Sequence, residues 1–222
     1  MTSQYNSLVR AARVWDRIAI FREAMDFLRS EASLNLLRYH PLGFIDCVLS
    51  DTSEERIQLH IWDQLLSARQ DPPNICHSHG WQLRSLVLVG QIVDETYDVR
   101  ADPNGEYEIY EVRYSSGISI SASIEHEPVG IMLERSDPIS AGEDYEIESS
   151  VFHNTAVGRY PAVTLLVADM RHRVPGRNIR LRGVPSELAY KRVALDPIAA
   201  TEMLGRVREA FATEVDRRAQ KN

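Results

Sequence analysis

Two hydrophobic periods divide the chain. Between Ser7 and Leu37 the apolar residues recur mostly at three- and four-residue steps among arginine and glutamate, which is typical of one or two amphipathic helices packed on another part of the protein. Over 41–185 the pattern changes to short runs rich in β-branched residues, separated by turn-forming clusters. A further helix is predicted near the C-terminus, because Asp196 is a good N-cap and Pro197 suits the first helical position.

Many short strands without intervening helices indicate an antiparallel sandwich or barrel. We therefore expect a mainly β protein whose single domain spans 1–222. Its expected parts are a helical N-terminal segment over 1–40, a β-barrel over 41–185 and a helical C-terminal segment over 186–222. No repeat, low-complexity tract or glycine-rich phosphate loop interrupts this plan.

The composition of the chain limits which kinds of partner we expect it to bind. A chain of 222 residues, 44% hydrophobic and 26% charged, is long enough to bury one core. Its net charge of −7 argues against nucleic acid as a partner, because phosphate binding needs a basic face. No apolar run resembles a secretory signal or a membrane span, so we expect a cytoplasmic protein that does not enter a membrane. Cys47 and Cys76 are too few for a disulfide framework.

The first candidates for a functional site are His77 and His79, which are separated by one residue at the start of an apolar run. Residues i and i+2 of a strand point the same way, so both imidazoles can reach one point inside a barrel. Two partly exposed histidines are the alternative, since this pair alone is a common pattern. His153, which lies eleven residues after Gly142 and before another apolar run, offers a third ligand.

The spacing around these histidines resembles the cupin superfamily. The first cupin motif is H-x-H, three or four residues, Glu, six residues and Gly; the second is Gly, five residues, Pro, four residues, His, three residues and Asn. Both spacings hold here, and three residue types depart: Leu83 replaces the Glu, Glu148 the Pro and Val157 the Asn. The matching positions are His77, His79, Leu83 and Gly90, then Gly142, Glu148, His153 and Val157. The resemblance implies a double-stranded β-helix, or jelly-roll, barrel.

A cupin subset with three histidines and no glutamate ligand, best known from the cysteine dioxygenases, is similar to this chain over about residues 44–170. Three features of that family are missing. The stretch matching the strand of its carboxylate-binding arginine, "FIDCVLS", holds Asp46 but no arginine. Leu83 stands where its crosslinked cysteine would be, and Thr164, Leu166 and Ala168 stand in the places of its Ser-His-Tyr triad. These departures argue against free cysteine as the substrate.

Three neutral imidazoles would bind Fe(II), and alternatively Zn(II), Ni(II), Mn(II) or Co(II), without neutralising its charge. An anionic, chelating substrate is then favoured, and coordination positions remain for it and for O₂. The sequence thus predicts a non-haem Fe(II), O₂-dependent cupin oxygenase acting on a small molecule. A cupin isomerase, hydrolase or lyase with a Lewis-acid metal, and a non-catalytic ligand-binding cupin, remain alternatives, since the fold alone hosts all three.

Further site residues are proposed from strand parity and chemistry, although packing inside the barrel would equally account for the aromatic ones. Arg84 is included only if a bulge turns it inward, and Asp46 would suit a cationic group. His40, His126 and His172 are expected to be exposed. A homodimer through barrel edges or flanking helices is also expected. The catalytic candidates are His60, Arg84 and Tyr97, and the substrate-binding candidates are Asp46, Trp81, Gln82, Arg84 and Tyr145.

Overall fold

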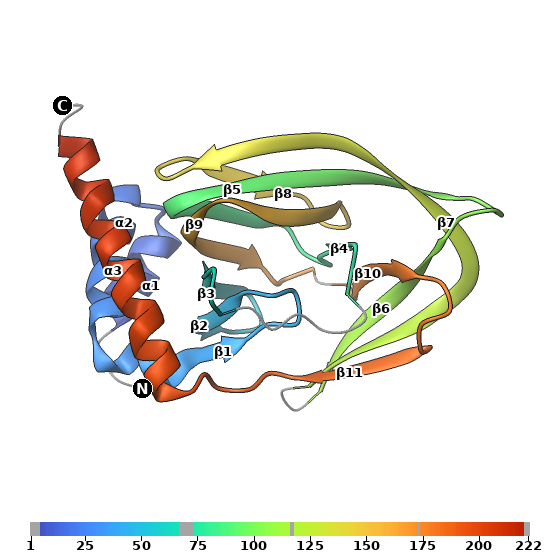
Figure 1. Cartoon of the computed structure of the whole chain (residues 1–222), viewed down its shortest axis with the longest axis horizontal. Helices are drawn as coiled ribbons and strands as arrows, with labels where there is room; N and C mark the ends of the chain where they lie inside the picture. Colours follow the sequence, from blue (N-terminus) through green and yellow to red (C-terminus); the bar gives the residue numbers. More distant parts are fainter. Residues whose placement is uncertain (1–4, 67–72, 116–117, 173, 220–222) are drawn as a thin grey trace.

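The computed structural model describes residues 5–66, 73–115, 118–172 and 174–219, without the side chains of 115, 125–126 and 218–219. The predicted mainly β fold with N-terminal helices and a C-terminal helix is confirmed, and the helices gather at one end of the sheet (Figure 1). The helices are α1 (Asn6–Arg13), α2 (Arg17–Arg29), the short 3₁₀ helix η2 (Glu31–Leu36) and α3 (Pro197–Ala219). The strands are β1 (Leu37–Tyr39), β2 (Ile45–Asp51), β3 (Glu55–Trp62), β4 (Cys76–Ser78), β5 (Leu83–Ala101), β6 (Tyr107–Ser115), β7 (Ile118–Ser140), β8 (Asp144–Ile147), β9 (Phe152–Asp169), β10 (Gly176–Leu181) and β11 (Glu187–Lys191).

Six strands form a closed circuit of antiparallel pairs. The pairing runs from β9 to β4, β10, β6, β7 and β5, and then returns to β9. The link between β4 and β9 is a single pair, His77 opposite His153. Strands β3, β2 and β1 continue the sheet from the other edge of β9, and β8 pairs with β5. Two of the three predicted metal ligands therefore lie at the point where the circuit closes.

The N-terminal apolar pattern belongs to two helices rather than one. Trp15 adopts a left-handed backbone conformation with φ of 53°, and this breaks the helix. The next helix starts at once, because the Asp16 side chain accepts a hydrogen bond from the backbone N–H of Ala19. Ile18, which the pattern includes among the apolar positions, is 82% exposed, since the break shifts the phase of the second helix.

Strands also occupy parts of the two segments predicted to be helical. β1 lies within 1–40, and β11, which pairs with β7, lies within 186–222. The C-terminal helix begins where the sequence places it, at Pro197, and the Asp196 carboxylate accepts hydrogen bonds from the backbone N–H groups of Ile198 and Ala199. Pro197 fits there because the first turn of a helix has no use for its missing N–H.

Strand alternation divides the interior into two cores. On β3 the side chains of Ile57, Leu59 and Ile61 pack with those of α1, α2 and α3. The alternate residues of the strand, which include His60 and Trp62, face the other way into a cavity. β9 alternates in the same manner, with alternate residues packing toward the helices or toward the cavity. The helices thus hold the wall of the cavity in place from behind.

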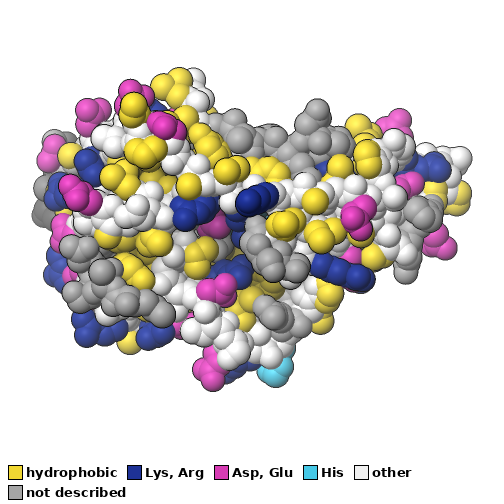
Figure 2. Space-filling view, turned by 90° about the horizontal axis from the view of Figure 1, so that it is seen from below, with side chains coloured by type: hydrophobic (Ala, Val, Ile, Leu, Met, Phe, Trp, Pro, Cys, Tyr) yellow, Lys and Arg dark blue, Asp and Glu magenta, His cyan; other side chains and the backbone are white. Residues whose placement is uncertain are grey.

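On the molecular face shown in Figure 2, the described Lys and Arg side chains are interspersed with Asp, Glu and hydrophobic side chains. Charge on that face does not gather into one patch of a single sign. Among the described residues, the helices are all too short or too polar to cross a membrane.

Candidate metal centre

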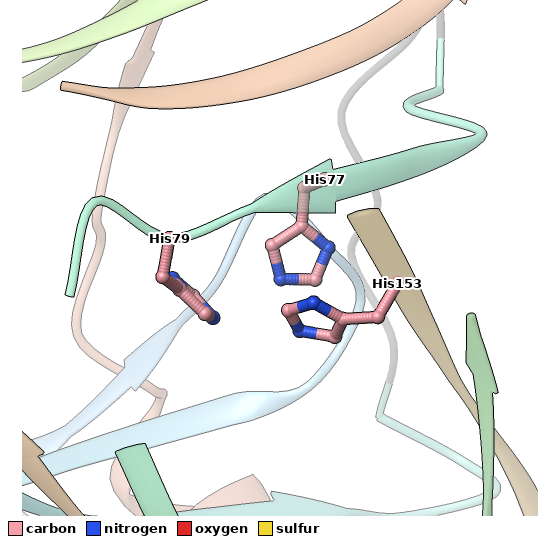
Figure 3. Close-up of side chains that lie close together, drawn as sticks. All are labelled: His77, His79 and His153. Atoms are coloured by element: carbon pink, nitrogen blue, oxygen red, sulfur yellow. The ribbon is translucent and has the colours of Figure 1, made fainter. Parts of the chain in front are cut away.

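Three histidines converge between β4 and β9. His77 lies on β4 opposite His153 on β9, and His79 follows directly after β4 ends. Their ligand nitrogens all lie within 4.8 Å of one another, and the three rings point toward a common space (Figure 3). The convergence predicted from the sequence is therefore present, and these residues are called the three-histidine cluster below.

The rings are close but not stacked on one another. The ring centres of His77 and His153 are 4.2 Å apart, those of His77 and His79 4.9 Å, and those of His79 and His153 5.1 Å. Metal–nitrogen bonds of about 2.1 Å place neighbouring ligand nitrogens roughly 3 to 3.5 Å apart around one ion. The ligand nitrogens, which lie within 4.8 Å of one another, are therefore close to the spacing that a shared ion requires.

All three imidazoles are kept neutral. Burial is the main cause that lowers the pKa of His77 and His79 well below the usual range, and it lowers the pKa of His153 to about 4. The Nδ1 atom of His153 lies 3.1 Å from the carbonyl oxygen of Val151. Nδ1–H donates to that oxygen, so the Nε2 lone pair is left for a ligand. No proton has to be displaced before such a cluster binds a cation.

The cluster opens into a cavity of about 60 Å³. One buried water needs roughly 10–15 Å³ of such space, so the cavity has room for an ion and a small ligand. We call it the histidine cavity. Among the described residues, its wall contains five histidines and two arginines but no acidic side chain. The lining residues are His40, Leu42, Phe44, Arg56, Gln58, His60, Trp62, His77, His79, Trp81, Leu83, Tyr114, Tyr145, Ile147, His153, Asn154, Thr155, Leu166 and Arg192.

Besides the three predicted metal ligands, three of the proposed catalytic and substrate-binding residues line this cavity: His60, Trp81 and Tyr145. The indole of Trp81 stacks on His79 with ring centres 5.2 Å apart and restricts the rotation of that imidazole. Burial raises the pKa of the Tyr145 hydroxyl, which therefore stays protonated. Leu83, at the position of the missing cupin glutamate, also lines the cavity and presents no ligand atom to it.

A second pair of histidines lies in the same cavity. The ring centres of His40 and His60 are 6.4 Å apart, and Phe44 packs against both rings. Arg192 Nη2 donates a hydrogen bond to His40 Nε2 over 2.9 Å, and the Gln58 amide lies 2.6 Å from His60 Nε2. Burial, aided by the charge of Arg192, lowers the pKa of His60 to about 3. Both rings of this His40–His60 pair therefore already have a hydrogen-bond partner.

Gln82 and Arg84 are not among the described residues that line the histidine cavity. Both line a shallow groove on the outer side of β5, away from the three-histidine cluster. Arg84 Nε donates to Asp144 Oδ2 over 2.9 Å, and its guanidinium lies 4.3 Å from the ring centre of Trp15. No bulge occurs at Arg84, so strand alternation keeps it on the face opposite Leu83.

Tyr97 and Asp46 are also absent from the described wall of the histidine cavity. The Tyr97 hydroxyl donates to Glu95 over 2.9 Å, and its ring packs beside Cys76 in a separate apolar cluster. Asp46 is 3% exposed and lies on β2 opposite His60. Burial raises its pKa. Neither Tyr97 nor Asp46 therefore lines the described wall of the cavity, and the roles proposed for them stay predictions.

Three further residues line the cavity although the sequence did not predict them there: His40, Arg56 and Arg192. His40 was expected to be exposed, but it packs under Phe44 and lines the cavity; His172 is exposed, and the His126 side chain lies outside the described residues. Arg56 could have been found, because it shares strand parity with His60. Arg192 follows β11, a strand that the sequence pattern did not predict, so nothing in the sequence linked it to the site.

Comparison with known proteins gives no family. No protein-family model matches the chain, and no curated protein matches its sequence at a significant level. Among solved structures, the chain is similar to Peruvianin-I, a cysteine peptidase from Thevetia peruviana latex, with 9% identity and a TM-score of 0.34 over 66% of this chain and 71% of that one. It is also similar to an oxalate oxidase, with 10% identity and a TM-score of 0.34 over 78% of this chain and 75% of that one. Likenesses at this level carry no inference about function.

Proposed function

We propose that the chain is a metal-dependent cupin oxygenase of the three-histidine type, which uses Fe(II) and O₂ to oxidise a small molecule other than free cysteine. The observation that carries this proposal is the convergence of three neutral imidazoles on one enclosed cavity. The spacing of the two cupin motifs, which brought His77, His79 and His153 to attention, supports it independently of the geometry.

The donor set suits a single divalent transition metal. His77, His79 and His153 would hold the ion through three imidazole nitrogens, with no carboxylate among them. When bound, Fe(II) would supply the ability to bring O₂ and an electron-rich substrate together for electron transfer. Because the ligands are neutral, the ion would keep its double positive charge and favour an anionic substrate.

The surrounding side chains would orient the ligands and limit the entry of water. The Val151 carbonyl fixes the tautomer of His153, and Trp81 restricts the ring of His79. Leu83, Ile147 and Leu166 supply apolar wall to the cavity. His60, with its pKa near 3, stays neutral at pH 7 and would contact a ligand as a hydrogen-bonding group rather than store a proton.

Metal analysis combined with oxygen consumption tests the proposal. Purified protein should contain close to one metal ion per chain, and protein loaded with Fe(II) should consume O₂ when a substrate is added. Small thiols and amino-acid derivatives form the first panel of substrates. Matched protein loaded with Zn(II) should bind the same compounds without consuming O₂.

Each other outcome points to a different activity. Stoichiometric zinc or nickel with no oxygen uptake after iron loading would favour an isomerase, hydrolase or lyase, in which the metal acts only as a Lewis acid. Protein that takes up no metal under any loading condition would contradict the proposal and favour a ligand-binding cupin.

A further inference from the structure

We propose that Arg192 and Arg56 form an anion subsite in the histidine cavity, so that the molecule bound there carries a small carboxylate. This inference rests on the proposed function for what lies at the three-histidine cluster, but the arginines themselves are independent of any metal. Neither arginine lies in residues 44–50, the stretch that matches the strand of the carboxylate-binding arginine in the cysteine dioxygenases.

Arg56 reaches the cavity because of strand alternation. It lies on β3, two and four residues before Gln58 and His60, and all three line the cavity. Its side chain is 17% exposed. Asp51, which is outside the described cavity wall, accepts from Arg56 Nε over 3.1 Å and from Nη2 over 2.8 Å. This pair of hydrogen bonds fixes the direction of the guanidinium, and among the described residues Nη1 has no hydrogen-bond partner.

Arg192 is slightly more exposed than Arg56, but its guanidinium has fewer hydrogen-bond acceptors. Its side chain is 21% exposed, and its guanidinium carbon lies 5.7 Å from the ring centre of Tyr114. Nη2 donates to His40, whereas Nη1 forms a long ion pair with Asp46, 3.9 Å from Oδ2 and beyond hydrogen-bond distance. Nε is buried and has no hydrogen-bond partner among the described residues. A buried charged donor without an acceptor is costly, so an oxyanion that accepted its hydrogen would be bound favourably.

The charge balance of the cavity points the same way. The carboxylates nearest the two arginines, Asp46 and Asp51, are not among its lining residues. The described wall of the cavity therefore presents two guanidinium groups and no negative charge. A divalent ion in the three-histidine cluster would add to this positive charge, and a planar carboxylate is the group that arginine binds best through two hydrogen bonds.

The anion subsite and the three-histidine cluster lie in the same region of the protein. Arg192 and His40 also line a second, adjoining cavity of about 50 Å³, whose wall includes His77 and His79. Arg192 therefore lines both cavities, and so do two of the predicted metal ligands, His77 and His79. A molecule that fits here is short, with an anionic group at the arginines and its other end directed at the cluster.

Calorimetric titration with malonate and with malonamide tests the subsite, since the two molecules are alike in size but only malonate is charged. Each is titrated into metal-free and into Zn(II)-loaded protein. In both forms we expect malonate to bind at least tenfold more tightly than malonamide. Arg192→Met should weaken malonate binding at least tenfold and leave malonamide binding within twofold of wild type. Arg84→Met, which removes an arginine outside the cavity, is the matched control and should leave malonate affinity unchanged within twofold.

Metal content separates this inference from the proposed function. Arg192→Met should retain the same metal stoichiometry as wild type, and failure of the wild-type chain to bind metal would contradict the proposed function while leaving the metal-free titrations decisive. The subsite is overturned if malonate binds Arg192→Met as tightly as wild type, if malonate and malonamide bind equally, or if malonate does not bind metal-free protein. Where Arg192→Met fails to fold, Arg192→Lys and Arg56→Met replace it, and unchanged malonate affinity in both overturns the inference.

Discussion

The three-histidine cluster and the His40–His60 pair lie in one cavity and share one electrostatic environment, yet they differ in what their nitrogens do. Burial lowers the pKa of all five rings, so each is neutral at pH 7. In the pair, the Nε2 atoms are occupied by Arg192 and Gln58. In the cluster, nitrogens from three side chains face one another within 4.8 Å.

This difference shows that a buried histidine is not in itself a metal ligand. Neutral imidazole is a necessary condition that both groups meet, because burial removes the proton in each. Convergence of lone pairs is the second condition, and only the cluster meets it among the described residues. The pair is instead suited to contacting a ligand through its ring faces and hydrogen bonds.

The largest effect that we expect comes from His153→Ala. Removing one of three ligands should weaken metal binding at least about 100-fold, because two imidazoles hold a divalent ion far less well than three. The measurement is metal content by elemental analysis after loading and gel filtration. His60→Ala is the matched control, since it removes the same ring from the other group and should retain full metal content. Equal metal loss in both variants, or none in His153→Ala, would erase the distinction between the groups.

Stability should depend on the helix side of β3 more than on its cavity side. Leu59 is 0% exposed and packs under the helices next to His60. Leu59→Ala should lower the free energy of unfolding by about 2–5 kcal/mol, because it leaves a void in a packed core. Gln58→Ala, on the cavity side, should cost about 1 kcal/mol, the typical contribution of one hydrogen bond. Urea unfolding measures both.

Folded Leu59→Ala protein should still bind metal fully, because the three-histidine cluster is held by β4 and β9 rather than by β3. Loss of metal from the folded variant would show that packing at Leu59 affects the three-histidine cluster through the cavity wall. A larger destabilisation by Gln58→Ala than by Leu59→Ala would contradict the division of β3 into a packing face and a cavity face.

The sequence predicts the cluster well because its evidence is local. His77 and His79 are two positions apart, and the motif spacing adds His153, so the cluster could be predicted without knowing the path of the chain. Arg84 was included only on the condition that a bulge turned it inward, and the regular register of β5 at this position provides no such bulge. Arg192 reaches the cavity only through the path of the chain after β11, and no periodicity encodes that path.

Acid should affect the two groups alike in metal-free protein. A histidine whose folded-state pKa lies below its ordinary value of 6.5 takes up its proton more readily when unfolded. Its contribution to stability is therefore complete above about pH 6.5 and is lost as the pH falls toward the folded-state pKa, near 3 for His60 and near 4 for His153. Each such ring adds a slope of up to about 1.4 kcal/mol per pH unit within that window.

His60→Gln and His153→Gln should each reduce this slope by up to one proton, as measured by urea unfolding of metal-free protein between pH 7 and pH 5. Only His153→Gln should also lose metal. Similar slopes in the two variants, together with loss of metal from His153→Gln alone, would support the contrast between the two histidine groups. A slope equal to that of wild type in either variant would mean that burial does not hold the replaced ring neutral.

The smallest effect is expected outside the cavity, at Arg84. Its guanidinium is paired with Asp144 and lies over the ring of Trp15, but its side chain is 39% exposed, so solvent screens the ion pair. Arg84→Met should lower the free energy of unfolding by about 1 kcal/mol or less, with metal content and oxygen uptake unchanged. Asp144→Asn removes the charge of the partner and also the ion pair that Asp144 forms with Arg17, so its effect should be at least as large as that of Arg84→Met. If Arg84→Met instead abolished oxygen uptake while metal content stayed complete, the outer face of β5 would belong to the site, and the contrast between the two histidine groups would describe only part of it.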